Sequence, residues 1–116
     1  MANEGVLTEK SKAFALNIIH MCRGIRGSNY ALMNQVLRSG TSIGANVHEA
    51  NFAYSKSDFA AKMQIALKEC NETEYWLDLL LSSKIISENY QQLLRDCREL
   101  KRMLIASCKT VKQGAN

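Results

Sequence analysis

Residues 37 to 50 read Leu37-Arg38-Ser39-Gly40-Thr41-Ser42-Ile43-Gly44-Ala45-Asn46-Val47-His48-Glu49-Ala50, and helical periodicity continues through both glycines of this segment. Glycines four residues apart lie one turn apart on the same face of a helix. Each one costs a helix about 0.5 to 1 kcal/mol relative to alanine. A helix that keeps both gains from the missing side chains, so we expect Gly40 and Gly44 to let a second helix approach closely.

Composition predicts an all-α chain. The 116 residues contain no proline, and 47% of them are hydrophobic. Long helices can therefore form without a proline to interrupt them. A chain of this length is expected to form one domain with its own core, here residues 1–116. Apolar runs stay well below the roughly 18 residues of a membrane span, and the N-terminus lacks the basic and apolar regions of an export signal. We expect a soluble, cytoplasmic protein.

Four amphipathic segments carry apolar residues at alternating spacings of three and four, which is typical of helices with one buried face. The expected helices span roughly residues 6–24, 29–53, 57–83 and 87–112. Short connections between helices favour antiparallel neighbours. The predicted architecture is therefore an up-down-up-down four-helix bundle.

Polar residues adjoin the glycine face of the second helix at spacings of four, four and three. They are Arg38, Ser42, Asn46 and Glu49. Buried polar groups are costly unless they are paired. We interpret them, together with the two glycines, as a helix-packing motif that sets helix register through interhelical or intersubunit hydrogen bonds. Ordinary solvent exposure and a ligand site are the alternatives.

The four cysteines, Cys22, Cys70, Cys97 and Cys108, lie far apart in the sequence, with no Cys-x-x-Cys pair. The spacing of zinc ligands is therefore missing. Three of the four fall on or beside the apolar stripes, where a free cysteine behaves as a small hydrophobic residue. We expect free thiols in a reducing compartment. A disulfide framework or a zinc site remains the alternative if the cysteines meet in three dimensions.

Basic residues concentrate on the fourth helix, in a chain whose fifteen Lys and Arg against eleven Asp and Glu leave a net charge of +4. They form a stripe opposite the apolar face of that helix: Arg95, Arg98, Arg102, Lys109 and Lys112. One interpretation is a solvated outer face with cations suitably placed near a helix C-terminus. The other is a surface that contacts the phosphates of a nucleic acid.

The sequence contains no recognisable catalytic motif. A di-metal bundle needs Glu-x-x-His on two helices, but Asn17 stands three residues before His20 and Ala45 three residues before His48. No phosphate-binding glycine loop or dinucleotide motif occurs. The carboxylates of the third helix, Glu69, Glu72, Glu74 and Asp78, are interpreted as surface charges or partners of nearby cations. We expect a non-enzymatic protein without metal or cofactor; an enzyme built on His48 and these carboxylates would need a metal or a pocket around them.

Large side chains off the tightest apolar stripes predict contacts between subunits of a homo-oligomer, because aromatic and aliphatic groups anchor interfaces. The candidates are Tyr54, Trp76, Leu79, Leu80 and Ile86.

Three segments carry a resemblance to a known family: residues 37–50, then Ser57-Asp58-Phe59, then Ala66-Leu67-Lys68-Glu69-Cys70-Asn71-Glu72-Thr73-Glu74-Tyr75-Trp76-Leu77. They resemble the signatures of small bacterial four-helix-bundle proteins encoded in intervening sequences of 23S ribosomal RNA genes. The accessory variability protein of diversity-generating retroelements is a relative of that family. The resemblance covers nearly the whole chain, including Lys10-Ser11-Lys12-Ala13-Phe14-Ala15. This sequence departs from the usual pattern at His48 and Cys70, where alanine is common.

The resemblance implies a ring-like homopentamer with a basic surface proposed to bind nucleic acid and, in the retroelement branch, a reverse transcriptase. No catalysis is attached to the family. Our leading hypothesis is therefore a non-enzymatic oligomeric scaffold that binds RNA or DNA largely through phosphate contacts, with structured ribosomal or retroelement RNA as a candidate ligand. The alternative is an adaptor that docks a protein partner, such as a reverse transcriptase, without binding RNA directly.

Overall fold

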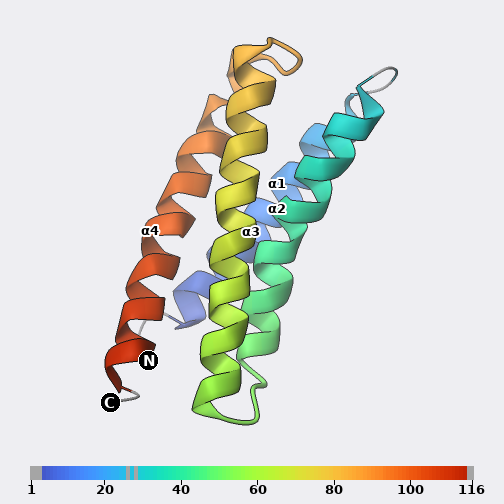
Figure 1. Ribbon diagram of the computed structural model, residues 1–116. Helices are drawn as coiled ribbons and strands as arrows, with labels where there is room; N and C mark the ends of the chain where they lie inside the picture. The colour runs from blue at the N-terminus through green and yellow to red at the C-terminus, as the bar shows by residue number, and fades with distance from the viewer. Residues whose placement is uncertain (1–3, 26, 28, 115–116) are drawn as a thin grey trace.

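The structure is a computed structural model that describes residues 4–25, 27 and 29–114, with the backbone alone at Glu4 and at residues 111–114. Its elements in chain order are α1 (Glu4–Arg23), α2 (Tyr30–Ala50), α3 (Lys56–Ser82), the 3₁₀ turn η1 (Glu88–Tyr90) and α4 (Gln91–Gly114). The four α-helices lie side by side and run alternately up and down (Figure 1). All secondary structure in the described ranges is helical, and none of these helices is both long and apolar enough to cross a membrane.

The second helix ends earlier than periodicity predicts. The expected range reaches residue 53, whereas α2 ends at Ala50. The amide of Phe52 donates to the carbonyl of Glu49 at 3.0 Å, and the amide of Ala53 donates to the carbonyl of Ala50 at 3.1 Å. Bonds that reach back three residues replace the four-residue pattern, so the chain tightens into a turn here.

Serines precede the next two helical elements. The side chain of Ser55 accepts a hydrogen bond from the amide of Asp58 at 3.0 Å and caps α3. The side chain of Ser87 accepts from the amide of Asn89 at 3.2 Å and caps η1. Short 3₁₀ turns are frequent at helix ends. As a result α4 itself begins at Gln91, four residues after the position that periodicity predicts.

One apolar core runs along all four helices. Its buried side chains include Leu7, Phe14, Ile18 and Met21 on α1, Val36, Ile43 and Val47 on α2, Met63, Cys70, Leu77 and Leu80 on α3, and Leu93, Cys97, Leu100 and Leu104 on α4. Burying one large aliphatic side chain stabilises a fold by about 1.5–3 kcal/mol. The side chains that point away from this core form the surfaces discussed below.

The helix that approaches the two glycines is α1. A β-carbon at Gly40 would lie 3.1 Å from Cγ1 of Ile18, and one at Gly44 would lie 3.3 Å from the backbone carbonyl oxygen of Ser11. Ser11 is itself small and buried, and its hydroxyl donates to the carbonyl of Thr8 at 3.2 Å. Small residues on both helices therefore bring α1 and α2 together almost backbone to backbone.

The polar residues beside this glycine face act mostly within α2. Ser42 Oγ donates to the carbonyl of Arg38 at 2.6 Å, and Asn46 Nδ2 donates to the carbonyl of Ser42 at 2.9 Å. The side chain of Glu49 is exposed and forms no hydrogen bond or ion pair with another described residue. Inside this chain, the expectation of interhelical bonding is therefore wrong for Ser42, Asn46 and Glu49. It holds for Arg38, which reaches α3.

A different polar pair joins α2 to α3 inside the core. The hydroxyls of Ser39 and Thr73 lie 2.9 Å apart and form a hydrogen bond, and both residues are buried. Thr73 Oγ1 also lies 2.7 Å from the carbonyl oxygen of Glu69 on its own helix. A buried hydroxyl without a partner is destabilising, so this pair favours one register of α2 against α3.

We predict that Gly44→Ala destabilises the fold. Overpacking of a closely fitted contact costs about 1–3 kcal/mol, and the better helix propensity of alanine offsets about 1 kcal/mol of that. The free energy of unfolding should therefore fall by up to about 2 kcal/mol, as measured by urea unfolding monitored by circular dichroism. Gly5→Ala is the matched control, because a β-carbon there meets nothing within 4 Å. Equal stability changes at both positions would contradict the close approach.

Candidate nucleic-acid interface

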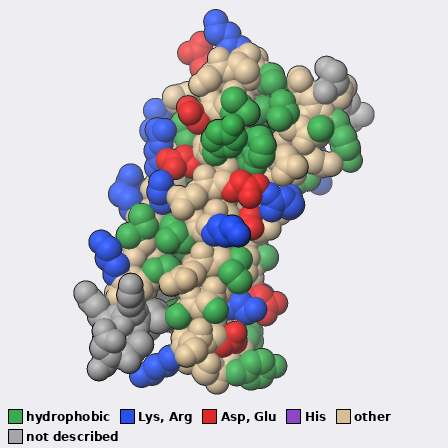
Figure 2. All heavy atoms as spheres, viewed as in Figure 1, with side chains coloured by type: hydrophobic (Ala, Val, Ile, Leu, Met, Phe, Trp, Pro, Cys, Tyr) green, Lys and Arg blue, Asp and Glu red, His purple; other side chains and the backbone are tan. Residues whose placement is uncertain are grey.

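Three cations stand along α4 at intervals of seven residues. Arg95, Arg102 and Lys109 are all exposed. Seven residues bring a helix to within about 20° of two full turns and advance it by about 10 Å, so these side chains form a nearly straight line. We call these three residues the basic row. Figure 2 shows Lys and Arg side chains gathered along the edge of the molecule where Figure 1 places α4.

Two other cations of α4 are paired with one carboxylate of α3. Arg98 Nε lies 3.0 Å from Oε2 of Glu74, and Lys101 Nζ lies 2.9 Å from Oε1 of the same residue. The hydrogen bond from Lys101, with a smaller one from Arg98, holds the pKa of Glu74 below its usual value although partial burial opposes this. Arg98, which periodicity groups with the basic stripe, therefore serves the α3–α4 interface.

The basic row has weaker partners. Arg95 Nε donates to the neutral side chain of Gln92 at 3.2 Å. The side chains of Arg102 and Lys109 form no hydrogen bond or ion pair with any described residue. Arg102 adds a small effect to that of Lys10, which holds the pKa of Glu99 below its usual value. Among the described cations of α4, positive charge is thus most available along this row, whereas the side chain of Lys112 lies outside the described residues.

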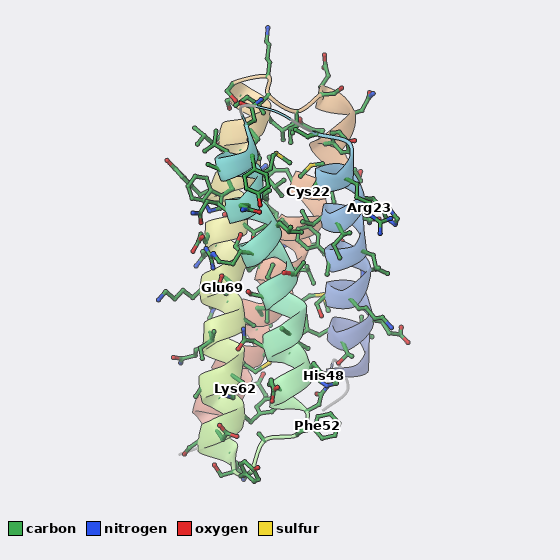
Figure 3. All side chains as sticks on the ribbon, turned by 90° about the vertical axis from the view of Figure 1, so that its right-hand side faces the viewer. Cys22, Arg23, His48, Phe52, Lys62 and Glu69 are labelled. Atoms are coloured by element: carbon green, nitrogen blue, oxygen red, sulfur yellow. The ribbon has the colours of Figure 1, made fainter. Side chains whose placement is uncertain are left out.

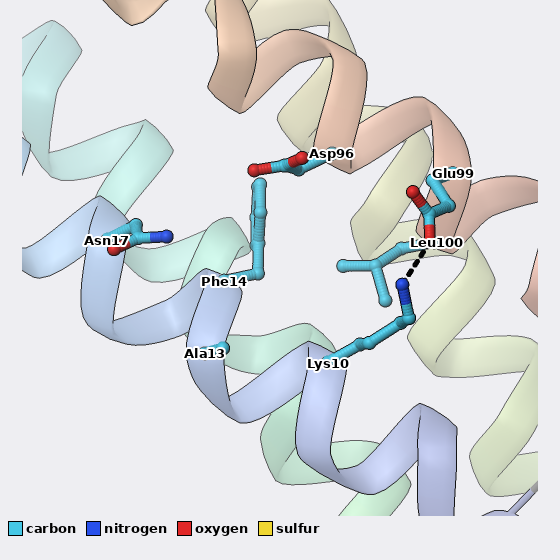
Figure 4. A pocket seen from close by; sticks show the side chains of 7 residues that line it. All are labelled: Lys10, Ala13, Phe14, Asn17, Asp96, Glu99 and Leu100. Atoms are coloured by element: carbon cyan, nitrogen blue, oxygen red, sulfur yellow. Dashed lines mark hydrogen bonds and ion pairs between the residues drawn. The ribbon is translucent and has the colours of Figure 1, made fainter.

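The seam between α1 and α4 is packed less closely than the other seams between neighbouring helices. Lys10 of α1 forms an ion pair with Glu99 of α4, while Asp96 and Phe14 point toward one another across the same seam (Figure 4). One cavity of about 190 Å³ lies beside this pair. A second, of about 290 Å³, adjoins it and is bordered by His20. Both are open to solvent, with mixed polar and apolar walls.

The histidines and carboxylates lie in separate places. His48 packs against Phe52 near the lower end of α2, with ring centroids 5.2 Å apart (Figure 3). Glu69 and Glu72 pair with Arg38. Across the described residues, no three His, Cys, Asp or Glu side chains come together as a metal ion would require. Of the four carboxylates that the sequence singles out on the third helix, Glu69, Glu72 and Glu74 are ion-pair partners, and Asp78 is exposed.

The outer face of α3 exposes large apolar side chains. Tyr75 is 59% exposed, Ile65 41% and Leu79 38%, and the partly buried ring of Trp76 lies against Tyr75 with centroids 5.2 Å apart. Trp76 Nε1 also donates to Glu72 at 2.9 Å. We call Ile65, Tyr75, Trp76 and Leu79 the aromatic face. Hydrophobic side chains gather over the upper part of α3 in Figure 2.

This face changes the set of candidate subunit contacts. Leu80 and Ile86 have only 0% and 2% of their surface exposed, because both lie in the core of their own chain. They are unavailable to a partner, and their assignment as contacts is wrong. Tyr54 is fully exposed in the turn between α2 and α3, and Leu79 stays accessible. The exposure of Tyr75 was not predicted.

We predict that Glu74→Gln weakens the fold in a pH-dependent way. The folded-state pKa of Glu74 is lowered, so its contribution is complete above the unfolded value of about 4.3 and disappears as pH falls through the folded value. The free energy of unfolding of the variant should be about 0.5–1 kcal/mol lower than that of the wild type at pH 7. This difference should become smaller below about pH 4. Urea unfolding from pH 7 to 3 measures this.

Asp78→Asn on the same helix is the control for the Glu74 variant. Asp78 is exposed and makes no ion pair in the described part of the chain. A deficit of the same size for both variants would contradict a specific bridge.

Comparison with known proteins places the chain in a family. One similar solved structure is a Bacteroides thetaiotaomicron protein of unknown function from the S23 ribosomal protein family. The two chains are 42% identical and superpose with a TM-score of 0.86, and the match covers 92% of this chain and 98% of the other. No curated protein matches the chain. The family model described as 23S rRNA-intervening sequence protein matches residues 4–106. The chain with this basic row and aromatic face therefore belongs to the 23S rRNA-intervening sequence protein family.

Proposed function

We propose that this chain is a non-enzymatic, oligomeric scaffold whose basic row binds nucleic acid, RNA above all, through phosphate contacts. The observation that carries the proposal is the line of Arg95, Arg102 and Lys109, which is exposed and has no ion-pair partner among the described residues. Its length is about 20 Å, from fourteen helical steps of 1.5 Å. The family is named after intervening sequences of 23S ribosomal RNA, a name that states no ligand, so the proposal rests on the charge of the basic row.

Cations spaced in this way favour binding without sequence readout. Lys and Arg on an exposed helix face neutralise phosphates and release their counterions, which makes the affinity fall steeply with salt. Sequence-specific readout would need side chains that reach base edges or stack on unpaired bases. The basic row has no exposed aromatic residue between its members. The expected ligand is therefore a phosphate backbone of suitable shape rather than a particular sequence.

Assembly would strengthen such contacts. A single chain offers three free cations in the row, which predicts weak binding on its own. Copies joined in one particle bind the same RNA with a high effective concentration. For a homopentamer, which the family resemblance implies, five copies at +4 each would carry a net charge of about +20.

The aromatic face is the surface we propose for that assembly. Exposed apolar groups clustered on one helix mark interaction sites more often than scattered ones do. Trp76 and Leu79 lie on this face, and the fully exposed Tyr54 lies in the turn that leads into α3. Arg38 pairs with both Glu69 and Glu72 beside it, so a second copy would meet one uncompensated negative charge there rather than two.

We predict that neutralising the basic row weakens RNA binding more than neutralising Arg98. Affinity of the full chain for a duplex RNA is measured by fluorescence anisotropy between about 50 and 300 mM salt. Arg102→Gln and Lys109→Gln should each reduce the affinity and lower the salt slope by about 0.7–0.9 for each phosphate that the variant no longer neutralises.

Arg98→Gln is the matched control for the row variants, because it removes the same charge from the same helix but from a paired position. Equal reductions in affinity at positions 98 and 102 would show that net charge alone matters and would contradict a role for the row. If the wild-type chain bound no RNA at about 50 mM salt, the adaptor interpretation would replace the scaffold.

We predict that the wild-type chain is larger than a monomer in solution and that Leu79→Glu shifts it toward the monomer. A charge on the aromatic face would have to be desolvated at an interface, which is strongly unfavourable. Sedimentation velocity at several concentrations measures the mass. Leu16→Glu is the control, because Leu16 is 48% exposed on α1, away from this face. A monomeric wild type, or equal dissociation by both variants, would rule out this surface.

A further inference from the structure

Two of the four cysteines meet in the middle of the bundle. Cys70 on α3 and Cys97 on α4 are both fully buried, and their sulfur atoms lie 3.8 Å apart. Cys70 Sγ lies 3.3 Å from the carbonyl oxygen of Cys97, and Cys97 Sγ lies 3.5 Å from the carbonyl oxygen of Cys70. This reciprocal arrangement places the two residues directly opposite each other, with the sulfurs in van der Waals contact.

We propose that Cys70 and Cys97 form an oxidisable dithiol, which a low-molecular-weight disulfide converts to a cross-link between α3 and α4. A protein disulfide needs sulfurs about 2.05 Å apart and facing side chains. The sulfurs, now 3.8 Å apart, must therefore approach by about 2 Å, which requires the two side chains to rotate about their Cα–Cβ bonds. Cys22, half-buried on α1, instead lies with its sulfur 3.9 Å from the carbonyl oxygen of Met33.

The reaction balances as two successive thiol–disulfide exchanges. One cysteine thiolate attacks the low-molecular-weight disulfide, forms a mixed disulfide and releases one small thiolate. The thiolate of the other cysteine then attacks the protein sulfur of the mixed disulfide and releases the second small thiolate. One S–S bond forms in the protein and one breaks in the oxidant. The two protons lost by the cysteines pass through solvent to the two small thiols.

The core around the pair resists this reaction while the helices stay closed. The neighbouring Cys70 thiol and burial raise the pKa of Cys97, Glu74 raises it further, and Lys101 opposes the rise. The thiolate is the reacting species, so oxidation requires a local opening between α3 and α4. The bridge from Glu74 to Arg98 and Lys101 holds the same two helices together at this point. Breaking that bridge should make the thiols easier to reach.

The test treats the folded, full-length chain with oxidised glutathione near pH 8, follows the fold by circular dichroism, and alkylates the remaining thiols. We expect peptide mapping to link Cys70 to Cys97, with Cys22 and Cys108 found as alkylated thiols or as mixed disulfides with glutathione. Dithiothreitol should restore all four. Four alkylated thiols after prolonged oxidation, or a link that includes Cys22 or Cys108, would overturn the proposal. A link that formed only in denaturant would overturn it as well.

Two variants sharpen the experiment. The Cys22→Ser, Cys108→Ser double variant keeps the buried pair and should form the cross-link at the wild-type rate. Glu74→Gln should form it several-fold faster, because the variant opens the α3–α4 interface more often. An unchanged rate in Glu74→Gln would contradict opening at this bridge as the step that admits the oxidant.

Discussion

The close approach of α1 to α2 constrains the rest of the bundle. At Gly44 the gap between the helices is so small that a β-carbon would lie 3.3 Å from a backbone oxygen of α1. On its other side α1 packs less closely on α4, and the two cavities lie along that looser seam. The remaining helices, α3 and α4, complete the core with their inner faces and present their outer faces to solvent. The candidate interaction surfaces lie on those two outer faces.

The two outer faces differ in the balance of charge and apolar area. On α3, Glu69 and Glu72 share one cation, Arg38 of α2, and the aromatic face lies beside them. On α4, Arg98 and Lys101 share one carboxylate, Glu74 of α3, whereas the basic row has no ion-pair partner among the described residues. Ion pairs near the surface contribute little stability each. Their larger effect here is to decide which charges remain available to a partner.

The sequence predicts the helices and most of the core, because spacings of three and four report directly which side of a helix is buried. It does not predict partners across helices, since these depend on the relative register of α3 and α4. For this reason periodicity grouped Arg98 with the unpaired cations of α4 and did not reveal the contact of Cys70 with Cys97. Leu80 was misjudged for a local reason: in a continuous run of leucines, periodicity does not single out the buried position. Ile86 lies in a connection, where no periodicity applies.

The two sides of α4 carry separate chemistry. On a helix with 100° per residue, Cys97 points about 120–160° away from the members of the basic row, into the core. A cross-link at Cys97 would fix α4 against α3 on its buried side and leave the exposed cations in place. The proposed phosphate binding depends on the exposed side alone, and the proposed thiol oxidation depends on opening of the buried side. Each proposal can therefore fail while the other holds, and the Glu74 bridge is the contact at which the two sides meet.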